Sequence, residues 1–172
     1  MIIAMTPYSS KPKPIVGVML VSSADKIPAL LASRPAYCHT LQYEWSILSS
    51  QLPDAPFAPF RIHHGSMANF GALHAALKNN QPLCQRWSEL TNRDLGNTEV
   101  LASLMFKASL DMNPNSIILF SSKKIAHIEA NVCAFADSSL EPPARQLFNL
   151  VQTESEQLGQ PPGAEPVALT KR

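Results

Sequence analysis

The chain has few cysteines, almost no net charge and no long apolar run. Its 172 residues include three cysteines, Cys38, Cys84 and Cys133, which are far apart and form no CxxC pair. This spacing predicts reduced, packing thiols and argues against disulfides or a metal centre. A net charge of +1, with the basic residues scattered along the chain, gives no electrostatic footprint for nucleic acid.

The longest apolar stretch at the start, Met1 to Met5, is broken at once by Thr6 and Pro7. It is far too short for a signal-peptide core or a membrane span, so we expect a cytoplasmic protein with no membrane contact. Apolar residues make up 45% of the chain, enough for one core. The prolines gather in 11–14, 53–59 and 142–162, which predicts loops and tails there.

Four segments have the length and composition of strands, and helical patterns follow them. The predicted strands are Ile15 to Val21, Cys38 to Tyr43, Phe60 to His64 and Ser116 to Phe120. The predicted helices begin at Ser22, Gly65, Asn97 and Lys124, and a further helix covers Ala144 to Leu158. Residues 81–96, anchored by Trp87, are predicted to be irregular.

Strands that alternate with helical patterns indicate βα units and a parallel sheet. We therefore predict an α/β fold of about four βα units. Its parts are an N-terminal extension over residues 1–14, the ordered body over 15–137, and a C-terminal helix and flexible tail over 138–172. The tail from Gly159 is too polar and proline-rich to fold alone.

The most informative stretch is Ser116 to Val132, in which a short apolar run leads through a serine-lysine turn into a helical pattern. That order predicts a buried parallel strand that delivers the chain onto a helix N-terminus. Free backbone N–H groups and the positive end of the helix dipole favour an anion such as phosphate there.

In detail this stretch resembles the last strand, loop and helix of the aldo-keto reductases. Gly17-Val18 resembles the family's glycine-valine-serine strand, Leu41 to Tyr43 its glutamine-bearing strand, and Phe60 to Ser66 the strand before its pyrophosphate loop. The resemblance covers about Ile15 to Phe135. It implies half of a TIM (β/α)8-type barrel, the half that binds NADP.

The resemblance also implies a set of cofactor contacts. Gln42 matches the glutamine that binds the nicotinamide carboxamide, and His63 falls where an aromatic ring stacks on the nicotinamide. The turn and helix after the last strand match the residues around the adenosine 2′-phosphate and the adenine. These are Ser121, Ser122, Lys124, His127 and Asn131.

Other interpretations of these residues stay open. Gln42 is equally a polar residue at a strand end, and His63 and His64 are expected to point to opposite faces of one strand. A zinc site that joins them to His74 is disfavoured because adjacent strand residues cannot easily bind one ion, so we expect no metal.

Several positions depart from the family pattern. Serine and histidine stand at 121 and 127 where the family has lysine and arginine, Ala130 replaces a glutamate, and Met19-Leu20 replaces residues that bind the nicotinamide amide. The family's catalytic tyrosine, lysine, aspartate and histidine belong to the other half of the barrel, so we expect no catalytic residue in this chain.

Three functions remain at this point. The first is a fragment or subunit of an NADP-dependent oxidoreductase that acts on carbonyl substrates and is inactive alone. The second is a non-catalytic half-barrel module that binds a nucleotide or has a structural role. The third is an unrelated parallel α/β domain. Four strands curved for a barrel leave two edges and one face uncovered. We therefore predict a homodimer or a partner chain, unless Met1 to Pro14 or the helix Ala144 to Leu158 covers the open side.

Overall fold

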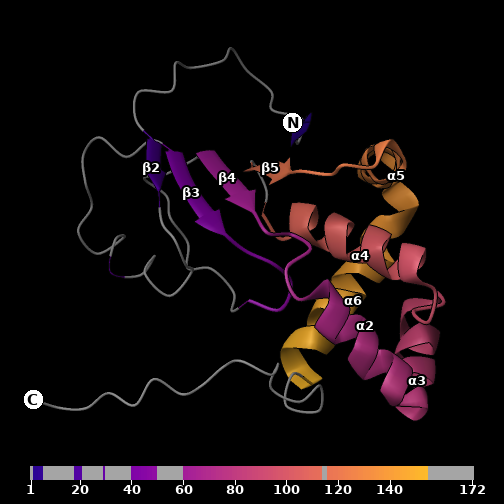
Figure 1. Ribbon diagram of the computed structural model, residues 1–172. Coiled ribbons are helices and arrows are strands. Elements are labelled where there is room, and N and C mark those ends of the chain that lie inside the picture. Colours follow the sequence, from indigo (N-terminus) through magenta and orange to yellow (C-terminus); the bar gives the residue numbers. More distant parts are fainter. Residues whose placement is uncertain are drawn as a thin grey trace, which may run out of the picture.

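A computed structural model describes residues 2–5, 18–20, 29, 40–49, 60–113 and 116–154 of the chain (Figure 1). The strands are β1 (Ile2–Met5), β2 (Val18–Leu20), β3 (Thr40–Glu44), β4 (Phe60–His64) and β5 (Ser116–Phe120). The helices are α2 (Phe70–Asn79), α3 (Gln81–Thr91), α4 (Thr98–Asp111), α5 (Ile125–Ala136), the short 3₁₀ helix η2 (Ser138–Leu140) and α6 (Glu141–Glu154).

The strands form one sheet in the order β1-β5-β4-β3-β2, which places four strands side by side in their chain order. The pairs β2–β3, β3–β4 and β4–β5 are parallel, which confirms the four predicted strands and the mixed α/β class. The helix predicted after Ser22 lies outside the described residues, as does the tail.

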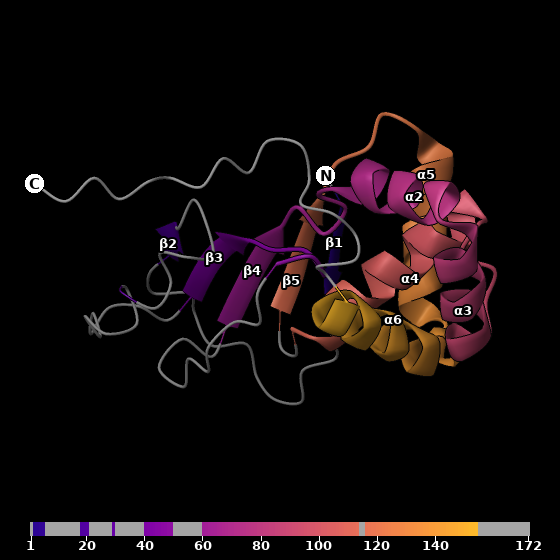
Figure 2. The same cartoon turned by 90° about the horizontal axis from the view of Figure 1, so that it is seen from below.

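The edge beyond β5 carries a strand that the sequence pattern did not predict. β1 pairs with β5 in the antiparallel sense, with Ile2 opposite Phe120 and Met5 opposite Ile117. Part of the N-terminal segment thus covers one edge of the parallel sheet. β2 forms the other edge of the described sheet, and Figure 2 shows the five strands in this order.

The prediction that residues 81–96 are irregular is wrong, because Gln81 to Thr91 form α3. The Asn80 side chain accepts a hydrogen bond from the Leu83 N–H (3.1 Å) and caps the helix, and Pro82 stands in its first turn, where proline is tolerated. Leu83, Trp87 and Thr91 recur every four residues on the buried face. The four-residue spacing from Leu83 through Trp87 was the missed signal.

The helices gather on the β5 side of the sheet in both views (Figures 1 and 2). They cover the sheet face that carries Tyr43, His63 and Ile118, which stand side by side in the register and are fully buried. α4 lies at the centre and packs against α2, α5 and α6. Side chains of β3, α2, α3, α4 and α6 form the larger hydrophobic cluster.

Hydrogen bonds and an ion pair join the C-terminal part of α6 to the segment after β3 and to α3. Gln152 Nε2 donates to the backbone oxygens of Ile47 (2.7 Å) and Ser49 (3.1 Å), just after β3. At the end of the helix, the Glu154 carboxylate accepts from the Trp87 indole N–H (3.0 Å) and pairs with Arg86. These contacts hold the C-terminal helix against the core and not over the opposite sheet face.

Candidate site at the carboxyl edge of the sheet

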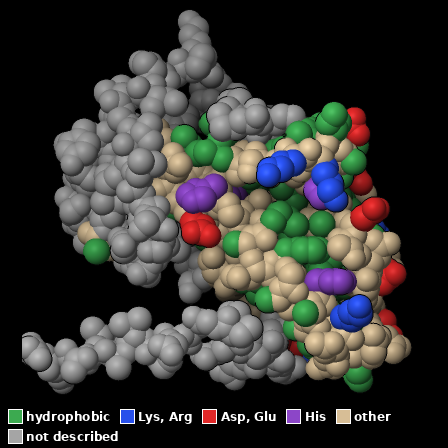
Figure 3. Space-filling view, viewed as in Figure 1, with side chains coloured by type: hydrophobic (Ala, Val, Ile, Leu, Met, Phe, Trp, Pro, Cys, Tyr) green, Lys and Arg blue, Asp and Glu red, His purple; other side chains and the backbone are tan. Residues whose placement is uncertain are grey.

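A cavity of about 1250 Å³ opens where β4 and β5 end. Parallel α/β sheets bind ligands at the carboxyl ends of their strands, and this cavity lies there because both strands deliver their chains onto turns and helices. Its walls come from the turn after β4, the start of α4, the turn after β5 and one side of α5. Figure 3 shows apolar side chains at the centre of this face, with histidine and basic side chains around them.

The turn between β5 and α5 is built by Ser122. Its hydroxyl accepts a hydrogen bond from the Lys124 N–H (3.1 Å) and donates to the Lys124 carbonyl (3.2 Å). Lys124 then precedes α5 in an extended conformation, with no side-chain cap. The chain therefore enters a twelve-residue helix whose N-terminal end faces the cavity through Ala126 and His127.

The cavity brings together four of the seven predicted cofactor contacts. Ser121, Ser122, His127 and Asn131 all line it. His127 is exposed, whereas Asn131, one turn further along α5, is half-buried. A hydroxyl pair, an imidazole and a carboxamide are therefore presented in order along one wall, each able to donate or accept hydrogen bonds.

The other three predicted contacts do not line the cavity. Lys124 is exposed at the start of α5. Gln42 is half-buried in β3, on the sheet face opposite Tyr43 and two residues before the strand ends. His63 lies in the core, and its neighbour His64 is the histidine that borders the cavity. As strand geometry requires, the two histidines occupy opposite faces.

His63 has an unusual environment for a titratable side chain. Its ring stacks on Tyr43 (centroids 6.0 Å apart) and meets Trp45 edge-on (6.2 Å). No hydrogen-bond partner is recorded for either ring nitrogen among the described residues. Burial, with a smaller contribution from the charge of His64, lowers the pKa of His63 to about 3, so the imidazole is neutral in the fold.

Tyr43 shares this buried face. Its hydroxyl donates to the Asn113 side-chain oxygen (2.8 Å), and burial raises its pKa to about 12, although Arg61 acts in the opposite direction. The phenol is thus occupied in the core and does not border the cavity. Tyr8 and Tyr37, the other tyrosines of the chain, lie outside the described residues.

Sequence reasoning missed the charged residues that line the same cavity. Arg93, Glu99 and Asp137 all line the cavity, from the turn before α4, the first turn of α4 and the residue after α5. They are distant from the serine-lysine turn in the sequence, and no motif links them to it. Only the turn that joins α3 to α4, in a segment that was predicted to be irregular, brings Arg93 to this place.

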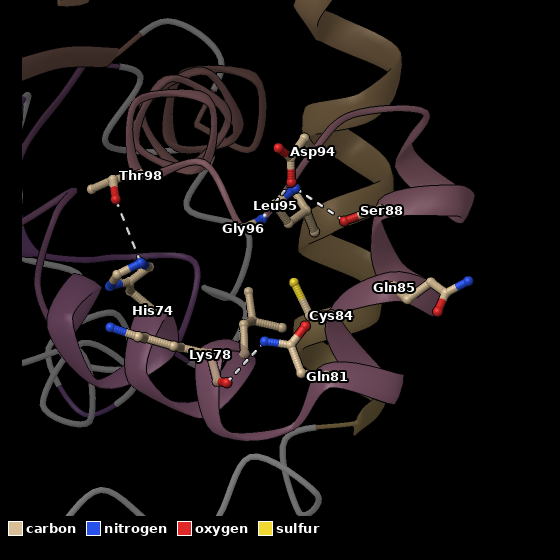
Figure 4. A pocket seen from close by; sticks show the side chains of 11 residues that line it. His74, Lys78, Gln81, Cys84, Gln85, Ser88, Asp94, Leu95, Gly96 and Thr98 are labelled. Atoms are coloured by element: carbon tan, nitrogen blue, oxygen red, sulfur yellow. Dashed lines mark hydrogen bonds between the residues drawn. The ribbon is translucent and has the colours of Figure 1, made fainter.

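A second, smaller cavity of about 560 Å³ lies between α2, α3 and the turn before α4. Figure 4 shows the Cys84 thiol pointing into it and His74 pointing across it toward Thr98, with 3.4 Å between His74 Nε2 and Thr98 Oγ1. None of the predicted cofactor contacts lines this cavity. Across the described ranges, no three acidic, histidine or cysteine side chains are grouped to hold a metal ion.

Comparisons with family models, curated proteins and solved structures found no match to this chain. None of the helices described above has both the length and the apolar character to cross a membrane.

Proposed function

We propose that this chain is a nucleotide-binding half barrel, similar to the cofactor half of the aldo-keto reductases, that binds NADP at the carboxyl edge of its sheet. One observation carries the proposal. Four of the five residues that the family resemblance selects around the adenosine 2′-phosphate and the adenine meet in one cavity at that edge: Ser121, Ser122, His127 and Asn131.

The strand order supports the half-barrel part of the proposal. In a TIM-type barrel each strand lies beside its predecessor in the chain, with helices on the outer face. β2, β3, β4 and β5 follow that order, all parallel, and the helices cover one face. In a complete barrel the next parallel strand would occupy the β5 edge where β1 now pairs.

We expect no carbonyl reduction by the chain alone. Hydride transfer to a carbonyl needs a general acid beside the nicotinamide. Tyr43, the tyrosine within the described ranges, is buried and bonded to Asn113. Activity would require a partner chain that supplies the catalytic half. Without such a partner, the alternative assembly is a homodimer in which two sheets pair through their β2 edges.

A purely structural role is the second candidate, and the acidic residues of the cavity favour it. Glu99 and Asp137 line the same cavity as His127, and each disfavours a phosphate nearby. The two candidates differ in one measurable property, because only the first predicts that the purified protein binds NADPH.

The proposal is tested by titrating the full chain with NADPH and with NADH and following cofactor fluorescence. We expect tighter binding of NADPH. His127→Ala should weaken NADPH binding by about tenfold to a hundredfold, since a charge-assisted hydrogen bond contributes about 1.5–3 kcal/mol, and should affect NADH less. The matched control is His74→Ala, in the smaller cavity, which should change neither affinity. Equal or absent binding of both cofactors would contradict the proposal.

An independent readout comes from the cysteines. Cys133 is exposed and lines the large cavity, whereas Cys84 is buried beside the smaller one. Bound NADPH should therefore slow alkylation of Cys133 and leave that of Cys84 unchanged, as measured by mass spectrometry of the two peptides. Slowing of both thiols alike would indicate general stabilisation and not occupancy of the cavity.

The partner is tested by light scattering at micromolar concentration. Exposed strand edges add further strands unless a charge or proline blocks them. If β2 pairs with another chain, Val18→Lys should shift the mass to that of a monomer. A sharp monomer mass for the unaltered chain would contradict self-association. Adding a separate catalytic half would then test whether the chain binds a different partner.

A further inference from the structure

We propose that Arg93 recognises the base of the bound nucleotide, by stacking its planar guanidinium group on the adenine ring. The inference rests on the proposed function and extends it to a residue that the family resemblance does not select. Arg93 lines the large cavity together with Asn131, on the wall that faces α5.

The backbone of Arg93 is fixed by the turn that ends α3. Asn92 adopts the left-handed conformation (φ 51°), and the Arg93 N–H donates to the Ser88 carbonyl (3.1 Å). The side chain therefore starts from a defined point, so little ordering of the backbone is needed when a ligand binds.

The guanidinium group has capacity left for a ligand. Among the described residues, its recorded hydrogen bond runs from Nη1 to the neighbouring Asn92 carbonyl (3.1 Å). A guanidinium has five N–H donors and two flat faces, and it stacks well on aromatic rings. Arg93 is half-buried, so a face of the group can meet a ring inside the cavity without full loss of hydration.

Arg93 lies close enough to Asp137, the residue that follows α5, for their charges to interact. A helix of twelve residues is about 18 Å long, so α5 separates His127, at its start, from Asp137, just after its end. Hydrogen bonds from Ser139 are the main cause that lowers the pKa of Asp137, and the charge of Arg93 contributes as well. That influence agrees with a place for Arg93 near the C-terminal end of α5.

The charges around Arg93 decide what it binds. Glu99 and Asp137 line the cavity with it, whereas His64 and His127 line the part nearer the strand ends. The Asp137 carboxylate, whose charge interacts with Arg93, opposes a phosphate at that end, but it does not oppose a neutral ring. Adenine is neutral and presents an extended aromatic face, so the phosphates belong at the N-terminal end of α5 and the base at Arg93.

The test compares Arg93→Ala and Arg93→Lys in the full chain, with Arg145→Ala on α6 as the matched control, since Arg145 is exposed and does not line the cavity. NADPH is titrated by fluorescence, and inorganic pyrophosphate is then used as a competitor without a base. Arg93→Ala should weaken NADPH binding by about tenfold, the size of a partly desolvated cation–π contact. The pyrophosphate affinity and the thermal midpoint should not change.

The lysine variant separates stacking from charge. Arg93→Lys keeps the charge but loses the planar group that stacks on a ring, so it should recover only a small part of the NADPH binding that the alanine variant loses. Full recovery of binding by lysine, or an equal loss of pyrophosphate binding in the alanine variant, would overturn base recognition in favour of a phosphate contact. NADPH binding unchanged in both variants would also overturn it, whereas a failure of the unaltered chain to bind NADPH would reject the proposed function itself.

Discussion

α4 and α5 are both apolar helices of similar length, yet they differ sharply in burial. Eight residues of the fourteen in α4 are buried, whereas in α5 only Ala134 is buried among twelve. Ile125 and Val132 of α5 are 74% and 47% exposed. α4 is enclosed by α2, α5 and α6, while α5 has the cavity on one side and open surface on another.

The comparison shows that apolar composition alone does not bury a helix. In α4 two buried polar side chains have internal partners. Lys107 Nζ contacts Glu141 (3.2 Å) and donates to the Phe135 carbonyl (3.4 Å), and Ser109 Oγ donates to the Met105 carbonyl (3.0 Å). Such a helix is part of the core. α5 instead presents small side chains to the cavity, which suits a wall that a ligand or a neighbouring chain can approach.

The largest loss of stability should come from a substitution in the buried helix α4. Phe106 is fully buried on α4 and meets Phe120 edge-on, with ring centroids 5.6 Å apart. Phe106→Ala should lower the free energy of unfolding by about 3–5 kcal/mol, because it removes apolar burial and leaves a cavity. Denaturant unfolding measures this loss, with Val132→Ala on α5 as the control, expected below about 1 kcal/mol. Similar losses of unfolding free energy in both variants would contradict the view that α4 belongs to the core and α5 does not.

An intermediate effect should come from acid, through the buried His63. Its pKa of about 3 in the fold lies below the ordinary value of about 6.5 in an unfolded chain. The unfolded state therefore binds the proton more readily. Stability is retained above about pH 6.5 and falls as the pH drops toward 3, by about 1.4 kcal/mol per unit, or about 2 kcal/mol by pH 5.

The acid prediction is checked by denaturant unfolding between pH 7 and pH 5. His63→Leu removes the titrating group and should flatten that dependence, whatever its effect on stability at pH 7. His74→Leu, on a half-buried histidine of α2, is the control and should keep the slope. An unchanged slope in the His63 variant would mean that other groups cause the acid sensitivity.

The smallest effect is expected at the exposed end of α5. Ile125→Gln should change the free energy of unfolding by no more than about 0.5 kcal/mol in a monomer, since the side chain is largely in water. If a partner chain covers α5, the same substitution should instead weaken association. Denaturant unfolding measures the free energy of unfolding, and light scattering measures association. Together they show whether the exposed apolar face of α5 is in water or covered by a partner chain.

Local patterns predicted the body of the fold well. The strands Phe60–His64 and Ser116–Phe120 and the cap at Asn97, whose side chain accepts from the Glu99 N–H (2.9 Å), are confirmed. Helix α2 begins five residues later than predicted because Gly65 (φ 77°) and Asn69 (φ 62°) hold left-handed turns. Helix α3 was missed although Leu83, Trp87 and Thr91 recur every four residues and Asn80 caps its start.

What the sequence determined by itself was the order of strands and helices and the serine-lysine turn before α5, because hydrophobic periodicity and capping act over a few neighbouring residues. The tertiary structure decided which residues meet. It buried His63 and left His64 beside the cavity, brought Arg93 across from α5, and paired Ile2–Met5 with β5. Such contacts join residues tens of positions apart and depend on how whole elements pack, which no local pattern encodes.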